Sequence, residues 1–324
     1  MEKFKEEYGV LNKYFNFLDI NKFFQYDDLN LNSKTYFVQN KQNKFILKYI
    51  PGEKIRPRLN KMCMILSFCK KQNIAVQEPI ESISEGFVLD NHYFLTKYYS
   101  GTYFDGTDLE LSNFAKNLAL LHKVLSKIKI SYNFEPFRES YKILKKTDLV
   151  KIKNIINKKE NQKTIFDRMF LDNFSLLESS FSDIAISEEY YKSGKQLIHF
   201  DLHPGNVIFN NHRVSAIIDF GSMRKGYLID DVAFSSFRFA SYGTKNPKKI
   251  VDKMEYFFNM YTKFNPLPEL FSEFPKIAKL QILKRLSFIL RNYYYTNTSF
   301  WISDMKNQLE FISLLEKIIN KLKN

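Results

Sequence analysis

The spacing of apolar residues divides the chain into a β-rich first third and a helical remainder. A short helix is predicted within residues 1–20 from apolar residues at helical spacing: Phe4, Val10, Leu11, Phe15 and Leu18. Two alternating runs between residues 28 and 50, KTYFVQN and KFILKYI, flank the polar turn NKQN and predict a β-hairpin. A helix to about Lys71 follows, with Pro57 in its first turn, where a missing amide proton costs little.

The stretch GFVLDNHYFLTKYY predicts a second hairpin that turns at Asp90–Asn91. Beyond Gly101 the periodicity becomes helical, and Thr107 with Glu110 suggests a capping box at a helix start. Residues 135–192 are expected to be mostly helical. Three further amphipathic helices are predicted near residues 247–264, 275–293 and 301–322.

One segment interrupts the helical part with two strand-like runs. It reads LIHFDLHPGNVIFNNHRVSAIIDFGSM, residues 197 to 223, in which NVIF and RVSAIID predict strands joined by a turn around Asn210–Asn211. The whole pattern predicts two unequal lobes, a β-rich lobe over residues 1–98 and a helical lobe over residues 99–324. Their junction is expected near Lys97–Gly101.

Composition and charge narrow the class of protein without identifying it. The 324 residues are 44% hydrophobic and 26% charged, which fits a soluble globular protein, and the net charge is +14. That charge is compatible with an anionic partner or with well-solvated lysine-rich faces. The densest basic stretch, residues 144–163, has few aromatic residues for base stacking, so nucleic acid is not the expected partner and an exposed helix and loop is expected.

The cysteines and the N-terminus show no sign of a metal site or of a signal peptide. Cys63 and Cys69 fall on one predicted helix without a Cys or His companion at metal-site spacing, so both are expected to be reduced, partly buried core residues. The sequence has no run of about 20 apolar residues. The N-terminus also lacks an apolar signal-peptide region, and the expected location is cytoplasmic.

The strand pair brings three oxygen-bearing side chains to one place. Pairing of its strands puts Asn206 and Asp219 at neighbouring strand ends, and Asp201 lies in the turn just before the first strand. An amide oxygen and a carboxylate suit Mg²⁺, and a second carboxylate can accept a proton from an attacking hydroxyl. This division of labour is typical of phosphoryl transfer. The alternative is that Asp201 and Asp219 simply cap turns.

The motif H-x-D-x-H-x-x-N in HFDLHPGN, followed by IIDFG, resembles the aminoglycoside phosphotransferase and choline kinase-like superfamily. These are small-molecule kinases, and the resemblance implies an α+β, bilobal protein-kinase-like fold with a small antiparallel β-sheet N-lobe and a larger, mostly helical C-lobe. It also implies a role for each residue of the motif: Asp201 as catalytic base, Asn206 and Asp219 as Mg²⁺ ligands, and His199, His203 and Asp231 as structural support. His122 in ALLHKVL matches a histidine of the same family.

In the first lobe, the resemblance implies that Lys48 contacts ATP phosphates and that a hinge at Lys97, Tyr98 and Tyr99 reads the nucleotide base. The loop DLNLNSKTYF has no glycine, although Ser33 and Thr35 could bond phosphate. Lys48 could instead be an outward-facing lysine on an edge strand.

Two positions depart from the family pattern. Met62 falls where the family carries the glutamate that pairs with the phosphate-binding lysine, and Phe200 replaces a smaller residue.

The resemblance implies an ATP- (or GTP-) and Mg²⁺-dependent phosphotransferase that acts on a hydroxyl of a small molecule. No activation-loop signature follows Asp219, so a protein acceptor is disfavoured. The acceptor stays open among an amino alcohol, a choline-like compound, an amino acid and a sugar: the run RNYYYTNTSFW could bind an ammonium group or be core, and Arg238 and Arg291 could bind an anionic group or pair with acids. The alternative function is a pseudokinase that binds nucleotide or a partner without turnover.

Overall fold

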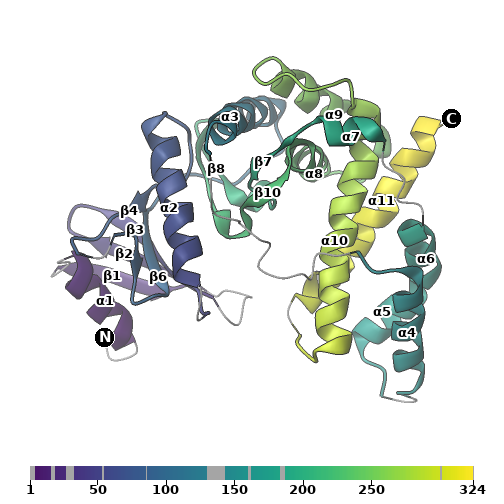
Figure 1. Ribbon diagram of the computed structural model, residues 1–324, viewed down its shortest axis with the longest axis horizontal. Coiled ribbons are helices and arrows are strands. Elements are labelled where there is room, and N and C mark those ends of the chain that lie inside the picture. Colours follow the sequence, from purple (N-terminus) through teal and green to yellow (C-terminus); the bar gives the residue numbers. More distant parts are fainter. Residues whose placement is uncertain are drawn as a thin grey trace.

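The computed structural model describes residues 4–323 except 16–18, 27–32, 53–54, 85, 130–142, 160–161, 183–186 and 300. Figure 1 shows an N-terminal region built on an antiparallel sheet and a C-terminal region built mainly of helices, with the two chain ends at opposite sides of the molecule. This is the bilobal α+β arrangement predicted from the sequence. The predicted boundary near residue 98 stays a prediction.

The N-terminal sheet has the order β1-β2-β3-β6-β4, and β5 also pairs with β6. Its strands are β1 (Ile20–Gln25), β2 (Lys34–Asn40), β3 (Lys44–Tyr49), β4 (Pro79–Ile80), β5 (Val88–Leu89) and β6 (Tyr93–Lys97). Both predicted hairpins are confirmed, since β2 pairs with β3 and β5 with β6. Strand β1 was not predicted. Helix α1 (Lys5–Phe15) covers one face of the sheet, because Val10, Leu11 and Tyr14 share a core with buried sheet residues.

Helix α2 (Ile55–Lys71) lies between the sheet and the C-terminal region (Figure 1). Its apolar face, which includes Leu59 and Leu66, belongs to the same hydrophobic core as the C-terminal helices. Cys63 and Cys69 are free and fully buried on this helix, rather than partly buried as expected, because both side chains point into that core. Helix α2 therefore couples the two regions by packing.

The C-terminal region contains the helices α3 (Asp108–Ser126), α4 (Lys146–Asn157), α5 (Ile165–Asp172), α6 (Phe174–Ser182), α7 (Glu188–Lys192), α8 (Leu228–Ala240), α9 (Pro247–Thr262), α10 (Phe274–Tyr295) and α11 (Met305–Lys323). The three amphipathic helices predicted near the C-terminus correspond to α9, α10 and α11. Almost every residue of α8 is buried, because α8 lies between α9 and α10 in the centre of the region. The helical core thus surrounds the segment that carries the candidate catalytic residues.

Helix α3 starts with only half of the predicted capping box. The hydroxyl of Thr107 accepts a hydrogen bond from the amide of Glu110 at 3.4 Å. The Glu110 carboxylate does not return to Thr107 but accepts from the amide of Asp105 at 2.9 Å. In a full capping box the Thr107 amide would donate to Glu110. Here that amide donates to the Asp105 carboxylate instead, at 2.9 Å.

Two short strand pairs interrupt the helices. Strand β7 (Lys195–Ile198) pairs with β10 (Arg224–Tyr227), and β8 (Val207–Asn210) pairs with β9 (Arg213–Ile217). The β8–β9 hairpin turns at Asn211 and His212, both left-handed, one residue later than predicted. This turn type matches the twist of the flanking strands.

The linker between the two regions runs directly over β8. The amide of Thr102 donates to Phe209 O at 2.9 Å, and the amide of Phe209 donates to Thr102 O at 2.8 Å. Gly101 has a φ of 153°, and a Cβ at this position would lie 2.0 Å from Phe209 O. Only glycine fits here, because the backbone of this segment approaches β8 so closely.

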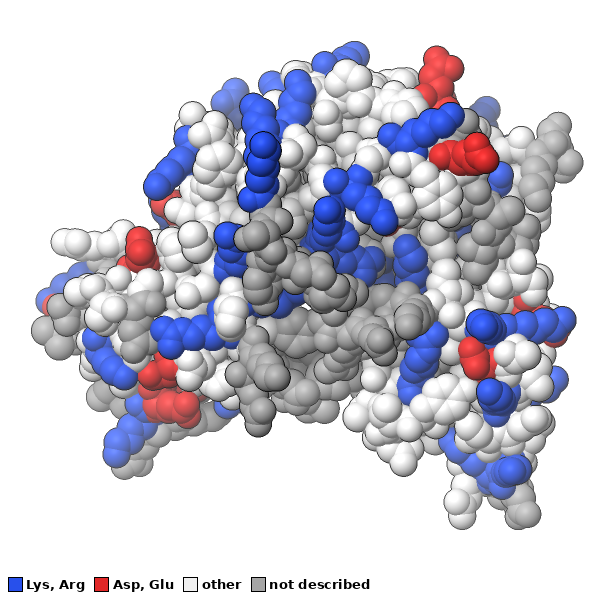
Figure 2. All heavy atoms as spheres, in the orientation of Figure 1, with Lys and Arg blue, Asp and Glu red and all other residues white. Residues whose placement is uncertain are grey.

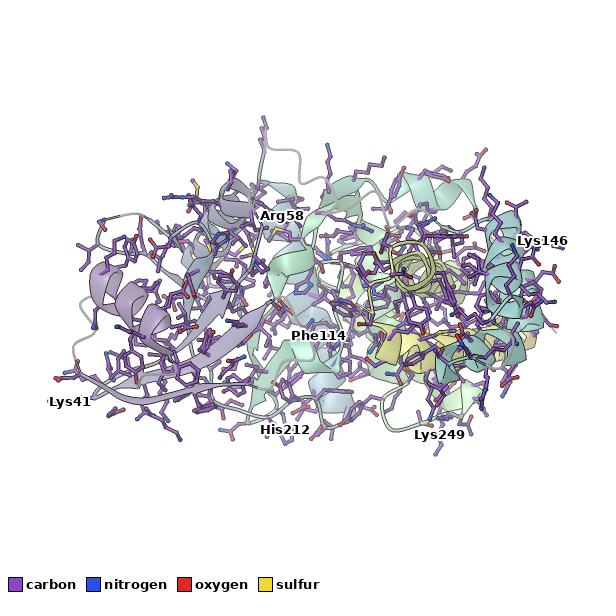
Figure 3. All side chains as sticks on the ribbon, turned by 90° about the horizontal axis from the view of Figure 1, so that it is seen from below. Lys41, Arg58, Phe114, Lys146, His212 and Lys249 are labelled. Atoms are coloured by element: carbon purple, nitrogen blue, oxygen red, sulfur yellow. The ribbon has the colours of Figure 1, made fainter. Side chains whose placement is uncertain are left out.

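Among the charged side chains on the visible surface, basic ones outweigh acidic ones (Figure 2). Figure 2 shows Lys and Arg side chains gathered in the middle of the face, and further lysines, such as Lys41 and Lys146, lie at the two far ends of the molecule in Figure 3. The basic helix α4 presents exposed lysines, as expected for residues 144–163. None of the helices among the described residues is long and apolar enough to cross a membrane. The predicted apolar position Leu18 lies outside the described residues.

Candidate active site

A cavity of about 720 Å³ lies between the N-terminal sheet, helix α2 and the segment that carries the predicted motif. Its walls include every residue predicted to bind nucleotide or metal or to act as the base: Ser33, Thr35, Lys48, Lys97, Tyr98, Tyr99, Asp201, Asn206 and Asp219. These residues come from distant parts of the sequence. The fold therefore brings the predicted set together around one hollow.

Asp201 and Asn206 are fixed to each other in the loop between β7 and β8. The Nδ2 of Asn206 donates to Asp201 O at 2.8 Å, which leaves the Asn206 side-chain oxygen without a hydrogen bond among the described residues. His203 caps the 3-10 turn Pro204–Asn206, since its Nδ1 accepts from the amide of Gly205 at 3.1 Å. Burial, together with nearby Arg238 and Arg285, lowers the pKa of His203, so the ring stays neutral and able to accept.

Asp219 follows β9 in the left-handed conformation, with φ 63° and ψ 57°. Its amide donates to Gln77 Oε1 at 2.9 Å, and its Oδ1 lies 3.1 Å from Lys48 Nζ. The Lys48 ammonium lowers the pKa of Asp219 against the opposing effect of burial. Asp219 is therefore an ionised carboxylate held at the cavity wall, and a backbone conformation of this kind is common at functional sites.

Lys48 lies on β3, which is flanked by β2 and β6 within the sheet. The alternative of an outward-facing edge lysine is therefore wrong. Met62, at the position of the family's glutamate, is buried and lines the cavity.

Helix α2 contacts the Asp219 loop through an arginine that the sequence analysis missed. Arg58 Nη2 donates to Gly221 O at 3.1 Å and to Met223 O at 2.8 Å. It lies between the two regions in Figure 3. A cation on α2 thus binds the loop that follows Asp219.

Asp231, in the first turn of α8, holds the backbone of the catalytic loop. Its two carboxylate oxygens accept from the amides of His199 and Phe200, each at 2.7 Å. His122 Nε2 lies 3.3 Å from Asp231 Oδ2, and the other ring nitrogen lies 2.8 Å from Tyr261 Oη. All of these side chains are buried, so the network is closed to solvent.

His199 links the two halves of the site. Its Nε2 lies 2.9 Å from Ile218 O, next to Asp219, and its Nδ1 accepts from the amide of Asp201 at 3.3 Å. One neutral tautomer satisfies both bonds. The relative position of Asp201 and Asp219 is thereby set through a single buried ring.

Arg285, on α10, is a second residue that the sequence analysis missed. Its Nη2 donates to Phe200 O and lies 3.2 Å from Asp201 Oδ1. Burial would raise the pKa of the Asp201 carboxyl, but the Arg285 guanidinium brings it below the usual value. Asp201 is therefore ionised. The only sequence signal was an arginine within the apolar run ILKRLSFIL, where an unpaired charge would be costly.

Three arginines stack on two phenylalanines beside Asp201. The ring of Phe200 lies 3.0 Å from the guanidinium carbon of Arg224 and 4.8 Å from that of Arg285, measured to its centroid. Arg285 also covers Phe234 at 3.8 Å, and Arg238 lies 5.5 Å from the same ring. Phe200 has a left-handed φ of 72°, and its large ring, unusual for the family, fills the space between two guanidinium groups.

The described aromatic residues of the run near residue 300 do not form a box at Asp201. Tyr293 and Tyr294 pack against α5, where Tyr294 Oη donates to Asp167 Oδ1 at 3.0 Å. Trp301 lines the cavity, and Phe300 lies outside the described residues. Arg291 faces Asp148 and Tyr295 rather than Asp201. Of the two arginines considered for the acceptor, only Arg238 lies near the base.

Three comparisons place this geometry among known proteins. Residues 28–251 match the family model described as a phosphotransferase enzyme family, and no curated protein matches the chain. Among solved structures, an amicoumacin kinase in complex with AMP-PNP and Ca²⁺ has a TM-score of 0.65 at 15% identity, covering 98% of this chain and 96% of that one. A spectinomycin phosphotransferase in complex with ADP and spectinomycin gives 0.66 at 15% identity, covering 98% of both chains.

An aminoglycoside phosphotransferase from Alicyclobacillus acidocaldarius gives a TM-score of 0.63 at 16% identity, covering 98% of this chain and 95% of that one. At such identities the likeness concerns the fold, which these kinases share over their whole length. The family match covers more than half of the chain and includes Lys48 and the complete motif around Asp201 and Asp219. The chain therefore belongs to the phosphotransferase enzyme family and is an enzyme of the kinase type.

Proposed function

We propose that the protein transfers the γ-phosphate of ATP, in a Mg²⁺-dependent reaction, to a hydroxyl of a small molecule. The observation that carries this proposal is the shared cavity of Lys48, Asp201, Asn206 and Asp219. Ammonium, base and two hard oxygen ligands around one hollow form the set that phosphoryl transfer uses. The assay described below tests whether the phosphate donor is ATP or GTP.

The nucleotide would lie against the sheet. Lys48 is the candidate for the phosphates, together with Ser33 and Thr35 at the start of β2. At the hinge, the amides of Lys97 and Tyr98 already donate to Glu78 O and Lys44 O. The amide of Tyr99 has no partner among the described residues and is our candidate for the hydrogen bond to the base.

Asn206 and Asp219 would hold the metal. Their donor set fits, because the Asn206 oxygen is free of other bonds and the Asp219 carboxylate is ionised. When bound, Mg²⁺ neutralises phosphate charge. The present ion pair of Lys48 with Asp219 keeps both groups at the cavity wall.

Asp201 would act as the base. The carboxylate accepts the hydroxyl proton of the acceptor while the acceptor oxygen bonds to the γ-phosphorus. The bond from that phosphorus to the bridging oxygen breaks, and ADP leaves. Arg285 supports this role because it keeps Asp201 ionised and fixes the loop at Phe200. Proton transfer of this kind contributes roughly 10²–10⁴-fold.

The charges around the base favour an acceptor with an anionic group. Arg238 is partly exposed and stacks on Phe234 and Phe311, and its guanidinium makes no hydrogen bond or ion pair with any described residue. Two acids, Asp201 and Asp304, lie close enough to Arg238 to interact with its charge. A free guanidinium binds a carboxylate or phosphate through two parallel hydrogen bonds. Of the acceptor classes considered, a hydroxylated amino acid fits this site best, and a polycation fits least well.

A second candidate is a protein that binds nucleotide or a partner without turnover. It is favoured by the replacement of the helix acid with Met62, which leaves Lys48 paired with Asp219 instead of α2. Nothing in the described residues calls for nucleic acid as a partner, and a cytoplasmic location remains a prediction.

The experiment is a nucleoside-diphosphate release assay with ATP and with GTP, with and without Mg²⁺, on a panel of hydroxylated amino acids, amino alcohols, choline-like compounds, sugars and aminoglycosides. We expect Mg²⁺-dependent release stimulated by the hydroxylated amino acids. In Arg238→Gln the KM for the acceptor should rise while the KM for ATP stays unchanged. Tight Mg·ATP binding without release on any acceptor would favour the second candidate.

A further inference from the structure

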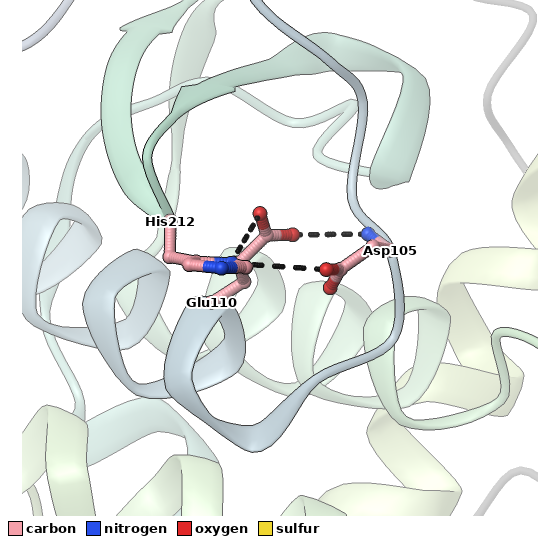
Figure 4. A group of neighbouring side chains, drawn as sticks. All are labelled: Asp105, Glu110 and His212. Atoms are coloured by element: carbon pink, nitrogen blue, oxygen red, sulfur yellow. Dashed lines mark hydrogen bonds and ion pairs between the residues drawn. The ribbon is translucent and has the colours of Figure 1, made fainter.

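A group of metal-binding side chains lies outside the active site, at the tip of the β8–β9 hairpin. Asp105 lies in the linker before α3, Glu110 lies in the first turn of α3, and His212 is in the hairpin turn. One ligand atom from each lies within 4.8 Å of the other two. Figure 4 shows the imidazole between the two carboxylates.

Each carboxylate has one oxygen tied to the backbone and one oxygen directed at His212. Glu110 Oε2 accepts from the amide of Asp105, and its Oε1 lies 3.4 Å from His212 Nδ1. Asp105 Oδ1 accepts from the amide of Thr107, and its Oδ2 lies 3.7 Å from the same nitrogen. Backbone hydrogen bonds of this kind orient the ligands of metal sites and fix their free lone pairs.

The backbone of the hairpin turn that carries His212 is held as well. Asn113 Nδ2 on α3 donates to His212 O at 2.9 Å, so the turn is fastened to the helix that provides Glu110. The distances from His212 Nδ1 are longer than good hydrogen bonds. They leave room for an ion between three ligand atoms, each about 2.0–2.2 Å from it, after small side-chain movements.

The local charge also favours a cation. Glu110 is only 2% exposed, and a buried carboxylate needs a partner that compensates its charge. The nearby Lys253 does not fill this role, because its Nζ donates to Gly106 O at 2.8 Å and lies 4.0 Å from Asp108 Oδ1. Metal coordination requires deprotonated ligands, so a bound ion would meet two carboxylates and one imidazole, a set that matches a divalent charge.

We propose that Asp105, Glu110 and His212 bind a divalent transition-metal ion such as Zn²⁺, with water completing the coordination. One imidazole and two carboxylates suit this class of ion, whereas Mg²⁺ and Ca²⁺ prefer oxygen ligands alone. The site is separate from Asn206 and Asp219. It joins the hairpin tip to the linker and to α3, so the ion would brace the hairpin whose base holds the catalytic metal ligands.

The test is isothermal titration of chelator-treated protein with Zn²⁺ in excess Mg²⁺, which occupies the catalytic site. We expect one Zn²⁺ per chain, with visible d–d absorption when Co²⁺ replaces it. His212→Asn should weaken binding at least tenfold. Asn tolerates the left-handed φ of 59° at this position, so the turn can form, and circular dichroism checks the fold. Glu110→Gln should have the same effect.

Two variants are matched controls. His92→Asn removes a histidine outside the proposed site, and Asp219→Asn removes the proposed catalytic metal ligand; both should retain full Zn²⁺ binding. Zn²⁺ should also raise the melting temperature of the wild type but not that of His212→Asn. Absence of stoichiometric binding, or binding that survives in folded His212→Asn, would overturn the proposal.

Discussion

Lys48 Nζ lies 3.1 Å from Asp219 Oδ1, so the candidate phosphate-binding lysine is paired with the candidate metal ligand rather than with helix α2. The same helix reaches the Asp219 loop with Arg58, which binds two carbonyls of that loop. The sheet and helix α2 are therefore both connected to the Asp219 loop. In the family pattern an acid on the helix pairs with the lysine, whereas here the helix contributes a cation to the loop. This arrangement leads to four predictions.

The first concerns the metal ligand. We expect Asp219→Ala to lower kcat by at least about 10²–10³-fold, because the carboxylate that would neutralise phosphate through Mg²⁺ is lost. Steady-state release of ADP measures the change, and a melting curve checks the fold. Lys48 also loses its partner, so Mg·ATP affinity should fall. Turnover close to that of the wild type would contradict the assigned role.

The second prediction separates the base from the nucleotide site. Asp201→Ala should reduce kcat by roughly 10²–10⁴-fold and leave the Kd for Mg·ATP nearly unchanged. Calorimetric titration with a non-hydrolysable ATP analogue measures that Kd. Strong loss of nucleotide affinity in a folded Asp201→Ala variant would mean that Asp201 binds nucleotide rather than the acceptor proton.

The third prediction concerns pH. Arg285 lowers the pKa of Asp201, and a base must be deprotonated, so activity is lost as pH falls through that lowered value. Removing the cation in Arg285→Gln raises the pKa, and the acid limb of the kcat profile should move to higher pH. Arg285→Lys, which keeps the charge, should move it less. An unchanged acid limb in Arg285→Gln would show that Asp201 is not the titrating group.

The fourth prediction concerns Arg58. Arg58→Ala leaves the carbonyls of Gly221 and Met223 without this charged donor, and we expect the free energy of unfolding to fall by about 2–3 kcal/mol. Arg56→Ala is the matched control, because Arg56 lies on the same helix and donates to Asn91 Oδ1 at the surface. Urea unfolding of both variants measures the difference. Equal losses would mean that the contact with the Asp219 loop adds no stability.

The sequence was most informative for secondary-structure elements whose pattern depends only on residues that are close along the chain. The alternating runs of β2, β3, β8 and β9 and the periodic helices α2, α9, α10 and α11 were all predicted, because each pattern is local. Strand β7 and strand β10 were harder, since the polar run RKGY becomes a strand only by pairing with Lys195–Ile198, a segment earlier in the chain. Strand β1 was missed because the short run INKFFQ, between the predicted helix and the predicted hairpin, was assigned to no element.

The candidate site shows the same limit. The motif gave Asp201, Asn206 and Asp219 because their spacing is fixed within one short segment. Arg58, Arg285 and Gln77 contact that segment from other parts of the chain, and their separations of 163, 84 and 142 residues leave no trace in local spacing. A buried cation in an apolar helix was the only available sign.

The hairpin that holds Asn206 and Asp219 is bordered on both edges. The amide of Gln77 donates to Ile217 O on the β9 side, and Thr102 exchanges two hydrogen bonds with Phe209 on the β8 side. These two sets of hydrogen bonds attach the hairpin to Gln77 and to Thr102. Any hinge motion that closes the protein over its substrates must therefore bend the chain away from these two attachment points, on the side of the N-terminal sheet. The β8–β9 hairpin would then remain stationary while strand β3, which bears Lys48, moves toward it or away from it.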